Sequence, residues 1–393
     1  MTVLVLSPFF PYPPKFGGGV RVYHLMRQLA REHRLLLLCY HDGEAVRDRG
    51  DMDTLCERVE GIPHKPSSKR LLQARSLFST RSFQELNHFS VPMQTAIDRV
   101  CAEENPDLIL VEFAQMGCFR FPEGIPLVID EHNVEYDLIR RMAGDGGGAM
   151  RRIFNVVEAA KFKRRELEWV GEAALTLVTS DRDGDLLKSE VPGLETALIT
   201  NGVDCDDFAP PEEREIEPDS LVFVGATHYY PNEDGIHFFM REVYPRLAAQ
   251  RPGLKVYLVG GRPPPAVAQY ASANVEVTGF VDDVRPYMWS SSVFIVPLRM
   301  GGGTRFKVVE AMASGVPVVS TRLGAEGIPL EQGRHALLAD RPEEFASAVT
   351  ELLDDRGKAE RLKEEGLRFV REHFDWSVIG DRLNRAVKRV VER

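Results

Sequence analysis

The chain of 393 residues is long enough for two or three domains, and 44% hydrophobic with 27% charged residues is typical of a folded protein. A formal net charge of -10 lacks the basic excess of nucleic-acid-binding proteins. Five cysteines without a Cys-x-x-Cys pair argue against a disulfide framework or a structural zinc site. The longest apolar run, Leu35–Tyr40, is far shorter than the roughly 20 residues that a membrane span needs. The N-terminus has no basic leader, so we expect a first strand there, in a reduced cytoplasmic protein.

Continuous Val/Ile/Leu-rich runs alternate with longer helical patterns, as in parallel sheets that helices bury on both faces. The expected strands of the first part are Val3–Leu6, Leu35–Tyr40, Leu108–Val111, Leu127–Asp130, Leu175–Thr179 and Ala197–Ile199. Those of the second part are Leu221–Val224, Val256–Val259, Val275–Thr278, Val293–Pro297, Pro317–Ser320 and Ala336–Leu338. The clearest helical patterns are Val20–Glu32, Arg151–Val170 and Trp376–Val391.

This alternation predicts an α/β protein with two doubly wound, Rossmann-like domains. The expected bounds are 1–203 for the first domain and 220–375 for the second, joined by an acidic, proline-bearing linker at 204–219. The last helix, 376–393, is expected to pack back on the first domain. Ligands of such sheets bind beyond the carboxyl ends of the strands, so a cleft between two facing domains is the expected site.

The most informative segment follows the expected strand Val293–Pro297. Three glycines at 301–303 precede a helix that begins near Thr304, an arrangement that suits a phosphate. Arg305 and Lys307 lie in the first helical turn, where a bound diphosphate would compensate their charge. Glu310 lies on the same helix face as Lys307, and its carboxylate can accept both hydroxyls of a ribose. The alternative is a surface Lys307–Glu310 pair worth about 0.2–0.5 kcal/mol.

GGGTRFKVVEAMASGVPVV, residues 301–319, resembles the signature of the nucleotide-sugar glycosyltransferases of family 4, which have two facing Rossmann-like domains (the GT-B fold). The resemblance extends through VFVGATHYYPNEDG, YLVGG, VTGFVDDVRPYM and FDWS, and more loosely into the first part of the chain. It implies a retaining transfer of sugar from a nucleoside diphosphate sugar, with the acceptor domain first and the donor domain second. Glu310 matches the second Glu of the family's Glu–seven residues–Glu pattern. Gly302 stands where the first would be, as in a Gly-rich branch of the family.

The resemblance also assigns roles to individual residues. It implies His132, which follows the strand Leu127–Asp130, as a catalytic residue together with Arg305 and Lys307, and it implies no metal or cofactor. The implied donor-binding residues are Gly18, Gly19, Gly225, Tyr230, Phe280, Val281, Gly302, Gly303, Thr304, Arg305, Lys307 and Glu310.

Helix capping is the alternative role for several of the polar side chains in these loops. Asp282 and Asp283 serve as caps or lie at the nucleobase, while Asn232 is expected to cap a helix that begins near Ile236. His132 and Asn133 have capping of the next segment as their alternative.

The implied donor is a nucleoside diphosphate sugar, with uridine as the commonest base, and the acceptor is a glycan, a lipid-linked or a small molecule. The locally basic stretch 61–84 is compatible with a peripheral contact to an anionic membrane. Three other functions stay open: a nucleotide-sugar epimerase or phosphorylase on the same fold, an inactive nucleotide-sugar binder, and a nicotinamide dehydrogenase. The last would need the Gly-x-Gly-x-x-Gly fingerprint, which the loop Gly17–Gly19 lacks.

Overall fold

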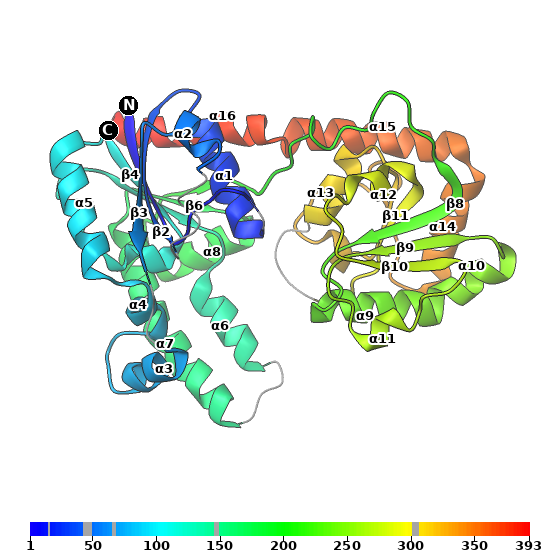
Figure 1. Cartoon of the computed structure of the whole chain (residues 1–393), viewed down its shortest axis with the longest axis horizontal. Coiled ribbons are helices and arrows are strands. Elements are labelled where there is room, and N and C mark those ends of the chain that lie inside the picture. The colour runs from blue at the N-terminus through cyan, green and yellow to red at the C-terminus, as the bar shows by residue number, and fades with distance from the viewer. Residues whose placement is uncertain (15, 42–48, 65–67, 145–148, 301–305) are drawn as a thin grey trace. The chain divides into compact units, whose positions relative to one another are not determined.

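The computed structural model describes residues 1–14, 16–41, 49–64, 68–144, 149–300 and 306–393. The chain divides into two compact units (Figure 1). One contains Met1–Thr200 and Ile379–Arg393, and the other contains Asn201–Val378.

The first unit is built on a seven-stranded parallel sheet of order β3-β2-β1-β4-β5-β6-β7. Its strands are β1 Thr2–Ser7, β2 Arg34–His41, β3 Arg58–Pro63, β4 Leu108–Glu112, β5 Leu127–Glu131, β6 Leu175–Val178 and β7 Thr196–Leu198. Its helices are α1 Gly17–Leu29, α2 Met52–Leu55, α3 Lys69–Leu77, α4 Phe83–His88, α5 Val91–Glu104, α6 Glu135–Gly144, α7 Ala149–Glu172 and α8 Asp181–Glu190. The strand order reverses between β1 and β4, which makes the carboxyl ends of these two strands a topological switch point.

The second unit has a six-stranded parallel sheet of order β10-β9-β8-β11-β12-β13. Its strands are β8 Glu217–Val224, β9 Lys255–Val259, β10 Val275–Gly279, β11 Ser291–Val296, β12 Val318–Ser320 and β13 Leu337–Leu338. Its helices are α9 Tyr230–Phe238, α10 Tyr244–Gln250, α11 Pro265–Ala268, α12 Arg285–Ser290, α13 Phe306–Ala313, α14 Pro342–Asp354 and α15 Arg356–His373. Here the order reverses between β8 and β11.

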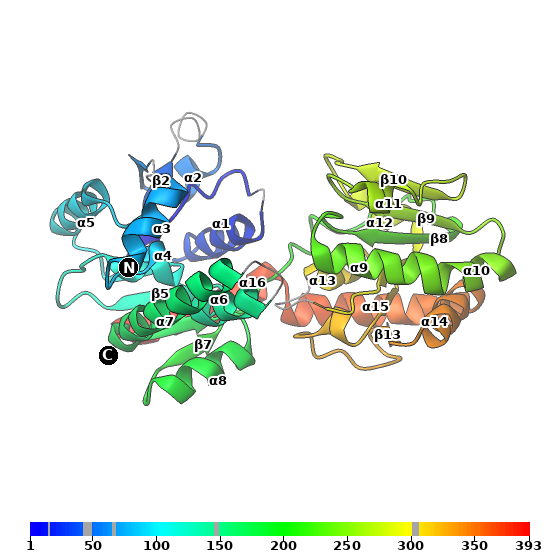
Figure 2. The same ribbon diagram turned by 90° about the horizontal axis from the view of Figure 1, so that it is seen from below.

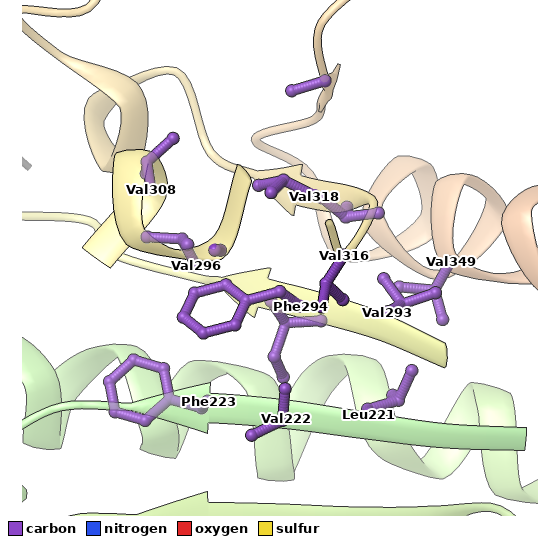
Figure 3. Packing of buried hydrophobic residues seen from close by; sticks show 14 of the residues in the cluster. Leu221, Val222, Phe223, Val293, Phe294, Val296, Val308, Val316, Val318 and Val349 are labelled. Atoms are coloured by element: carbon purple, nitrogen blue, oxygen red, sulfur yellow. The ribbon is translucent and has the colours of Figure 1, made fainter. Parts of the chain in front are cut away.

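The core of the second unit forms where these two central strands meet the helices. Phe223 of β8 and Phe294 of β11 are fully buried, with Val308 of α13 and Val349 of α14 in the same apolar cluster (Figure 3). Burying side chains of this size contributes about 1.5–3 kcal/mol each. The packing fixes where β8 and β11 end, and hence where the loops after them begin.

The last helix, α16 Trp376–Val391, belongs to the first unit from Ile379 onward and packs on α1 (Figures 1 and 2). Asn384 Nδ2 donates to the carbonyl of Gln28 at 3.2 Å, and Lys388 pairs with Glu32. A Cβ at Gly380 would lie 2.5 Å from the side chain of Gln28, so only glycine allows the two helices to approach this closely.

Three elements differ from the sequence predictions. The strand β3 was not expected, because RVEGIP has a glycine, a proline and only two buried residues at the sheet edge. The helix α9 begins at Tyr230 rather than near Ile236, with Pro231 accommodated in its first turn. The strand β8 begins at Glu217, inside the segment expected to be linker.

Among the described residues, no helix has both the length and the apolar character required to cross a bilayer.

Candidate functional site

In the second unit, Lys307 is held above the carboxyl end of β8. It is the second residue of α13, and its Nζ donates to Asn232 Oδ1 at 2.8 Å. The same Nζ lies 4.4 Å from the centre of the Phe223 ring, within the range of a cation–π contact. Asn232 is fixed in turn, because its Nδ2 donates to the carbonyl of Ala226 at 2.9 Å. The expectation that Asn232 caps α9 is therefore wrong: it lies inside the first turn and positions the lysine.

Two glycines permit a close approach of backbone segments beside this lysine. A Cβ at Gly225 would lie 2.8 Å from Lys307 Nζ and 2.9 Å from Asn232 Nδ2. A Cβ at Gly260, after β9, would lie 1.9 Å from the carbonyl oxygen of Gly225. A side chain is excluded at Gly260, and at Gly225 it would have to displace Lys307 or Asn232, so the ends of β8 and β9 present backbone next to a positive charge. This is the local geometry that an anionic ligand needs.

Glu310 lies one turn further along α13 and is half-buried. Burial raises the pKa of its carboxyl to about 6, and the charge of Lys307 opposes that rise. The structure thus keeps Lys307 and Glu310 on one face of α13, and it directs the lysine to Asn232. The ribose role of Glu310 stays a prediction.

Exposed aromatic rings stand beside the same strand ends. The Phe280 side chain is 80% exposed and follows Gly279, whose φ of 73° favours glycine. Phe280 Cβ lies 3.7 Å from the Cβ position of Gly261, and the Gly261 carbonyl accepts from Thr227 Oγ1 at 3.1 Å. Gly261 therefore contacts both Phe280, in the loop after β10, and Thr227, in the loop after β8. Tyr230 is also exposed, at the start of α9, and Val281 is half-buried. Large exposed apolar side chains at strand ends are typical of a ligand-binding surface.

Asp283 lies one residue before Val284, the N-cap of α12, and contacts the start of that helix. Its Oδ1 accepts from the backbone N–H of Arg285, the first residue of α12, at 2.9 Å. Gly302, Gly303, Thr304 and Arg305 lie outside the described residues, so their roles stay predictions.

In the first unit, His132 lies in a buried cluster of charged side chains at the carboxyl ends of β4 and β5. Its Nε2 lies 3.0 Å from Glu112 Oε2 and 3.3 Å from Asp130 Oδ2. Arg21 of α1 binds Asp130 with two hydrogen bonds, Nε to Oδ2 at 2.8 Å and Nη2 to Oδ1 at 2.6 Å. Arg21, Glu112 and Asp130 are at most 1% exposed and His132 is 8% exposed.

The charges of this cluster shift one another's pKa values. Burial and the negative charge of Asp130 raise the pKa of Glu112 to about 7. Burial alone would raise the pKa of Asp130, but Arg21 and His132 outweigh it and hold that pKa well below its usual range. Burial lowers the pKa of His132, yet the two carboxylates outweigh it and the net shift is upward. The two carboxylates thus favour a proton on Nε2 of His132.

The ligand-type atoms of Glu112, Asp130 and His132 lie within 4.8 Å of one another, the only such group within the described ranges. Both Asp130 oxygens already accept from Arg21, so a metal ion would have to displace the guanidinium. The donor set fits a hydrogen-bonded cluster better than a metal centre. The prediction that no metal is required stays a prediction.

Phe113 connects His132 to the glycine loop that the sequence singled out. Its ring stacks on His132 with the ring centres 3.6 Å apart, and its φ of 67° is unusual for a residue with a side chain. A Cβ at Gly18 would lie 2.9 Å from Phe113 Cζ, and one at Gly19 would lie 3.2 Å from the Phe16 ring. The structure therefore brings the first turn of α1 and His132 together around one aromatic ring.

The capping of α6 does not come from His132 or Asn133, so that alternative is wrong. Buried Glu166 of α7 accepts from the backbone N–H groups of Glu135 and Tyr136 at 2.7 and 2.9 Å. Burial raises the pKa of Glu166 to about 8. This long-range cap was not predictable, because Glu166 lies within a charged stretch typical of a solvated helix face.

Arg21, Glu112 and Phe113 were not predicted as site residues. Glu112 and Asp130 end adjacent strands, which is the signal that would have found the acidic pair. Arg21 has no distinguishing local pattern.

Part of the chain matches a known protein family, and the chain has curated relatives. Residues 218–355 match the family described as "Glycosyl transferases group 1". The chain is 19% identical to a Klebsiella pneumoniae protein described as an uncharacterized 44.6 kDa protein in the cps region, over 95% of this chain and 96% of that protein. It is 27% identical to the phosphatidyl-myo-inositol mannosyltransferase of Mycobacterium tuberculosis over 215 residues, 51% of this chain and 56% of that enzyme. The second match therefore spans only about half of either protein.

Solved structures show the same fold at low sequence identity. Sucrose-phosphate synthase of Thermosynechococcus elongatus superimposes with a TM-score of 0.70 at 17% identity, over 100% of both chains. Anabaena HepE in complex with UDP gives 0.66 at 15% identity, over 99% of this chain and 100% of that chain. The expected two-domain α/β fold of the GT-B type is confirmed. The matched segment and the mannosyltransferase relative make the chain similar to glycosyltransferases, and the solved structures show the fold.

Proposed function

We propose that the protein transfers a sugar from a nucleoside diphosphate sugar to an acceptor hydroxyl, with retention at the anomeric carbon, in glycan or glycolipid synthesis. The observation that carries the proposal is Lys307, fixed by Asn232 beside the glycine-lined ends of β8 and β9. All of these residues lie within the segment that matches the glycosyltransferase family. A uridine nucleotide is the first choice of donor, in line with the UDP bound by the structurally similar HepE.

In the proposed reaction, Lys307 binds the diphosphate and stabilises the charge that develops on it as the bond to the sugar breaks. Arg305 and the N-terminus of the following helix add to this stabilisation, according to the sequence. Glu310 accepts the ribose hydroxyls, and Phe280 covers an apolar face of the nucleotide. Because protein cations neutralise the leaving group, no divalent metal is required.

The acceptor is bound by the first unit, whose cluster at His132 contributes the other polar groups. With Nε2 occupied by Glu112 and Asp130, Nδ1 is the ring nitrogen through which His132 hydrogen-bonds substrate. The acceptor hydroxyl attacks the sugar on the face from which the diphosphate leaves, and its proton passes to an oxygen of the departing diphosphate. The mannosyltransferase relative makes a lipid acceptor a natural first candidate.

Calorimetric titration of the full chain with UDP tests the donor site. We expect Lys307→Ala to weaken UDP binding at least about tenfold, because hydrogen bonds to charged groups contribute about 1.5–3 kcal/mol. Lys255→Ala is the matched control, because Lys255 begins β9 at the opposite end of the strand and its Nζ donates to the carbonyl of Ala273.

Unchanged UDP affinity in Lys307→Ala would contradict the placement of the donor site. A donor sugar that is epimerised without any acceptor would favour an epimerase instead. NMR spectra of the donor after incubation with the enzyme distinguish epimerisation from transfer.

A further inference from the structure

The helix α3 presents apolar side chains to solvent beside its basic ones, which is unusual for a surface helix. Leu72 and Ser76 are its buried residues. On the outward side, Leu71 and Leu77 are more than half exposed and Phe78, the residue after the helix, is 94% exposed.

A second exposed apolar group lies on the neighbouring helix α7. Ile153 and Val156 are 66% and 54% exposed. The two helices are in contact, since Lys161 Nζ donates to the carbonyl of Ser76 at 2.5 Å (Figure 1). We call Leu71, Leu77, Phe78, Ile153 and Val156 the α3–α7 surface. Next to it an open hollow of about 340 Å³ is lined by Ala74, Arg75, Phe78, Ser79 and Leu86.

Basic side chains flank this surface, and among the described residues no carboxylate pairs with Lys69, Arg70 or Arg75. Between Glu60 and Glu85 the sequence has five basic residues and no acidic one. Lys69, Arg70 and Arg75 are exposed, and none of them forms an ion pair with any described residue.

Two carboxylates on the neighbouring helices α4 and α7, Glu85 and Glu158, are buried and have partners of their own. Glu85 pairs with Arg165 at 3.1 Å. Glu158 accepts from the backbone N–H of Phe83 at 2.5 Å and pairs with Lys161 at 3.4 Å. Neither carboxylate pairs with the exposed basic side chains of α3, whose charges face solvent.

We propose that the α3–α7 surface binds the interface of an anionic lipid bilayer. Exposed Phe and Leu side chains can insert among the acyl chains, while Arg and Lys extend their charged ends to the headgroups. A protein partner would have to supply a matching acidic surface for these cations, whereas an anionic bilayer offers negative charge over its whole face. Lipid binding itself does not depend on sugar transfer. Only its benefit, access to a lipid-linked acceptor, rests on the proposed function.

Co-sedimentation of the full chain with vesicles tests the proposal. We expect binding to phosphatidylcholine vesicles that contain phosphatidylglycerol and none to phosphatidylcholine alone. Salt at about 1 M should abolish it, because the Debye length is then about 3 Å. Arg70→Glu with Arg75→Glu should weaken partitioning at least about tenfold, since each basic residue near the membrane contributes roughly fivefold. Leu77→Ser with Phe78→Ser should also weaken it about tenfold or more.

The matched control is Arg385→Glu with Arg389→Glu. It makes the same charge change at exposed positions of α16, in the same unit, and should bind vesicles like the wild type. UDP titration of every variant keeps this test separate from that of the donor site. A protein that binds UDP but not anionic vesicles would overturn only the membrane proposal.

Two further outcomes would overturn the proposal. One is vesicle binding that the α3 variants leave unchanged. The other is a wild-type dimer, seen by analytical ultracentrifugation, that Leu77→Ser with Phe78→Ser dissociates, because the face would then be an interface between copies of the chain. As a positive measurement, the fluorescence of the tryptophan introduced by Phe78→Trp should be quenched by brominated lipid in anionic vesicles.

Discussion

Replacing Gly225 by alanine should displace Lys307 without unfolding the domain. The added methyl would lie 2.8 Å from Lys307 Nζ and 2.9 Å from Asn232 Nδ2. Ordinary contacts between such atoms are about 3.5 Å, so each neighbour would have to retreat by roughly 0.6–0.7 Å. The Asn232 amide is held by the carbonyl of Ala226, whereas the lysine is flexible. The lysine is therefore the group that moves. Some stability is lost as well, because the φ of Gly225 is 159°, a value that residues with a side chain rarely adopt.

The functional cost follows from the bond that the displaced lysine no longer makes. Losing one charge-assisted hydrogen bond of about 1.5–3 kcal/mol should weaken UDP binding at least about tenfold. Isothermal titration calorimetry measures the affinity, and thermal melting confirms the fold. Gly253→Ala is the control, because a Cβ there meets nothing within 4 Å. Wild-type affinity for UDP in Gly225→Ala would refute the diphosphate role of Lys307.

Glu310→Gln should weaken UDP binding about tenfold and spare pyrophosphate, because the carboxylate is assigned to the ribose; equal effects on both ligands in calorimetry would contradict that assignment. Sugar transfer should persist in EDTA, because Lys307 and its neighbours neutralise the diphosphate, and an activity that disappears and returns with Mn²⁺ would show the opposite. Glu112→Gln should lower the pKa of His132, because a carboxylate 3.0 Å away helps to raise it, and NMR titration of the ring protons measures the shift. Thermal stability should fall as pH rises from about 5 to 8, because native Glu166, with a pKa of about 8, keeps a proton that the unfolded chain releases. Glu166→Gln should flatten this fall in melting experiments across the pH range, and an unchanged slope would refute its cause.

Much of the fold was predictable because buried parallel strands have a simple sequence pattern. The runs at Leu35–Tyr40 and Leu108–Val111 are apolar throughout and form strands in the interior of the sheet. The edge strand β3 was missed, because it needs fewer buried residues and tolerates glycine and proline. The start of α9 was misplaced for a related reason, since a proline that indicates a loop is equally suited to a first helical turn.

In the candidate donor site, too, some features follow from the local sequence pattern and others only from tertiary contacts. The spacing of Lys307 and Glu310 places both on one face of α13, which helical periodicity alone determines. The partner of the lysine was not predictable, because Asn232 is 75 residues away and sits in a turn that favours a capping role.

The sequence by itself therefore determined local features. These are the runs that form strands, the glycine-rich segment that precedes α13, and the residues that share one face of a helix. Only the tertiary structure assembled Arg21, Glu112, Asp130 and His132, which come from three separate parts of the chain. The parallel pairing of β1, β4 and β5 brings these parts to one edge of the sheet. A buried charge is stable only beside a compensating one, and that requirement leaves no periodic trace in the sequence.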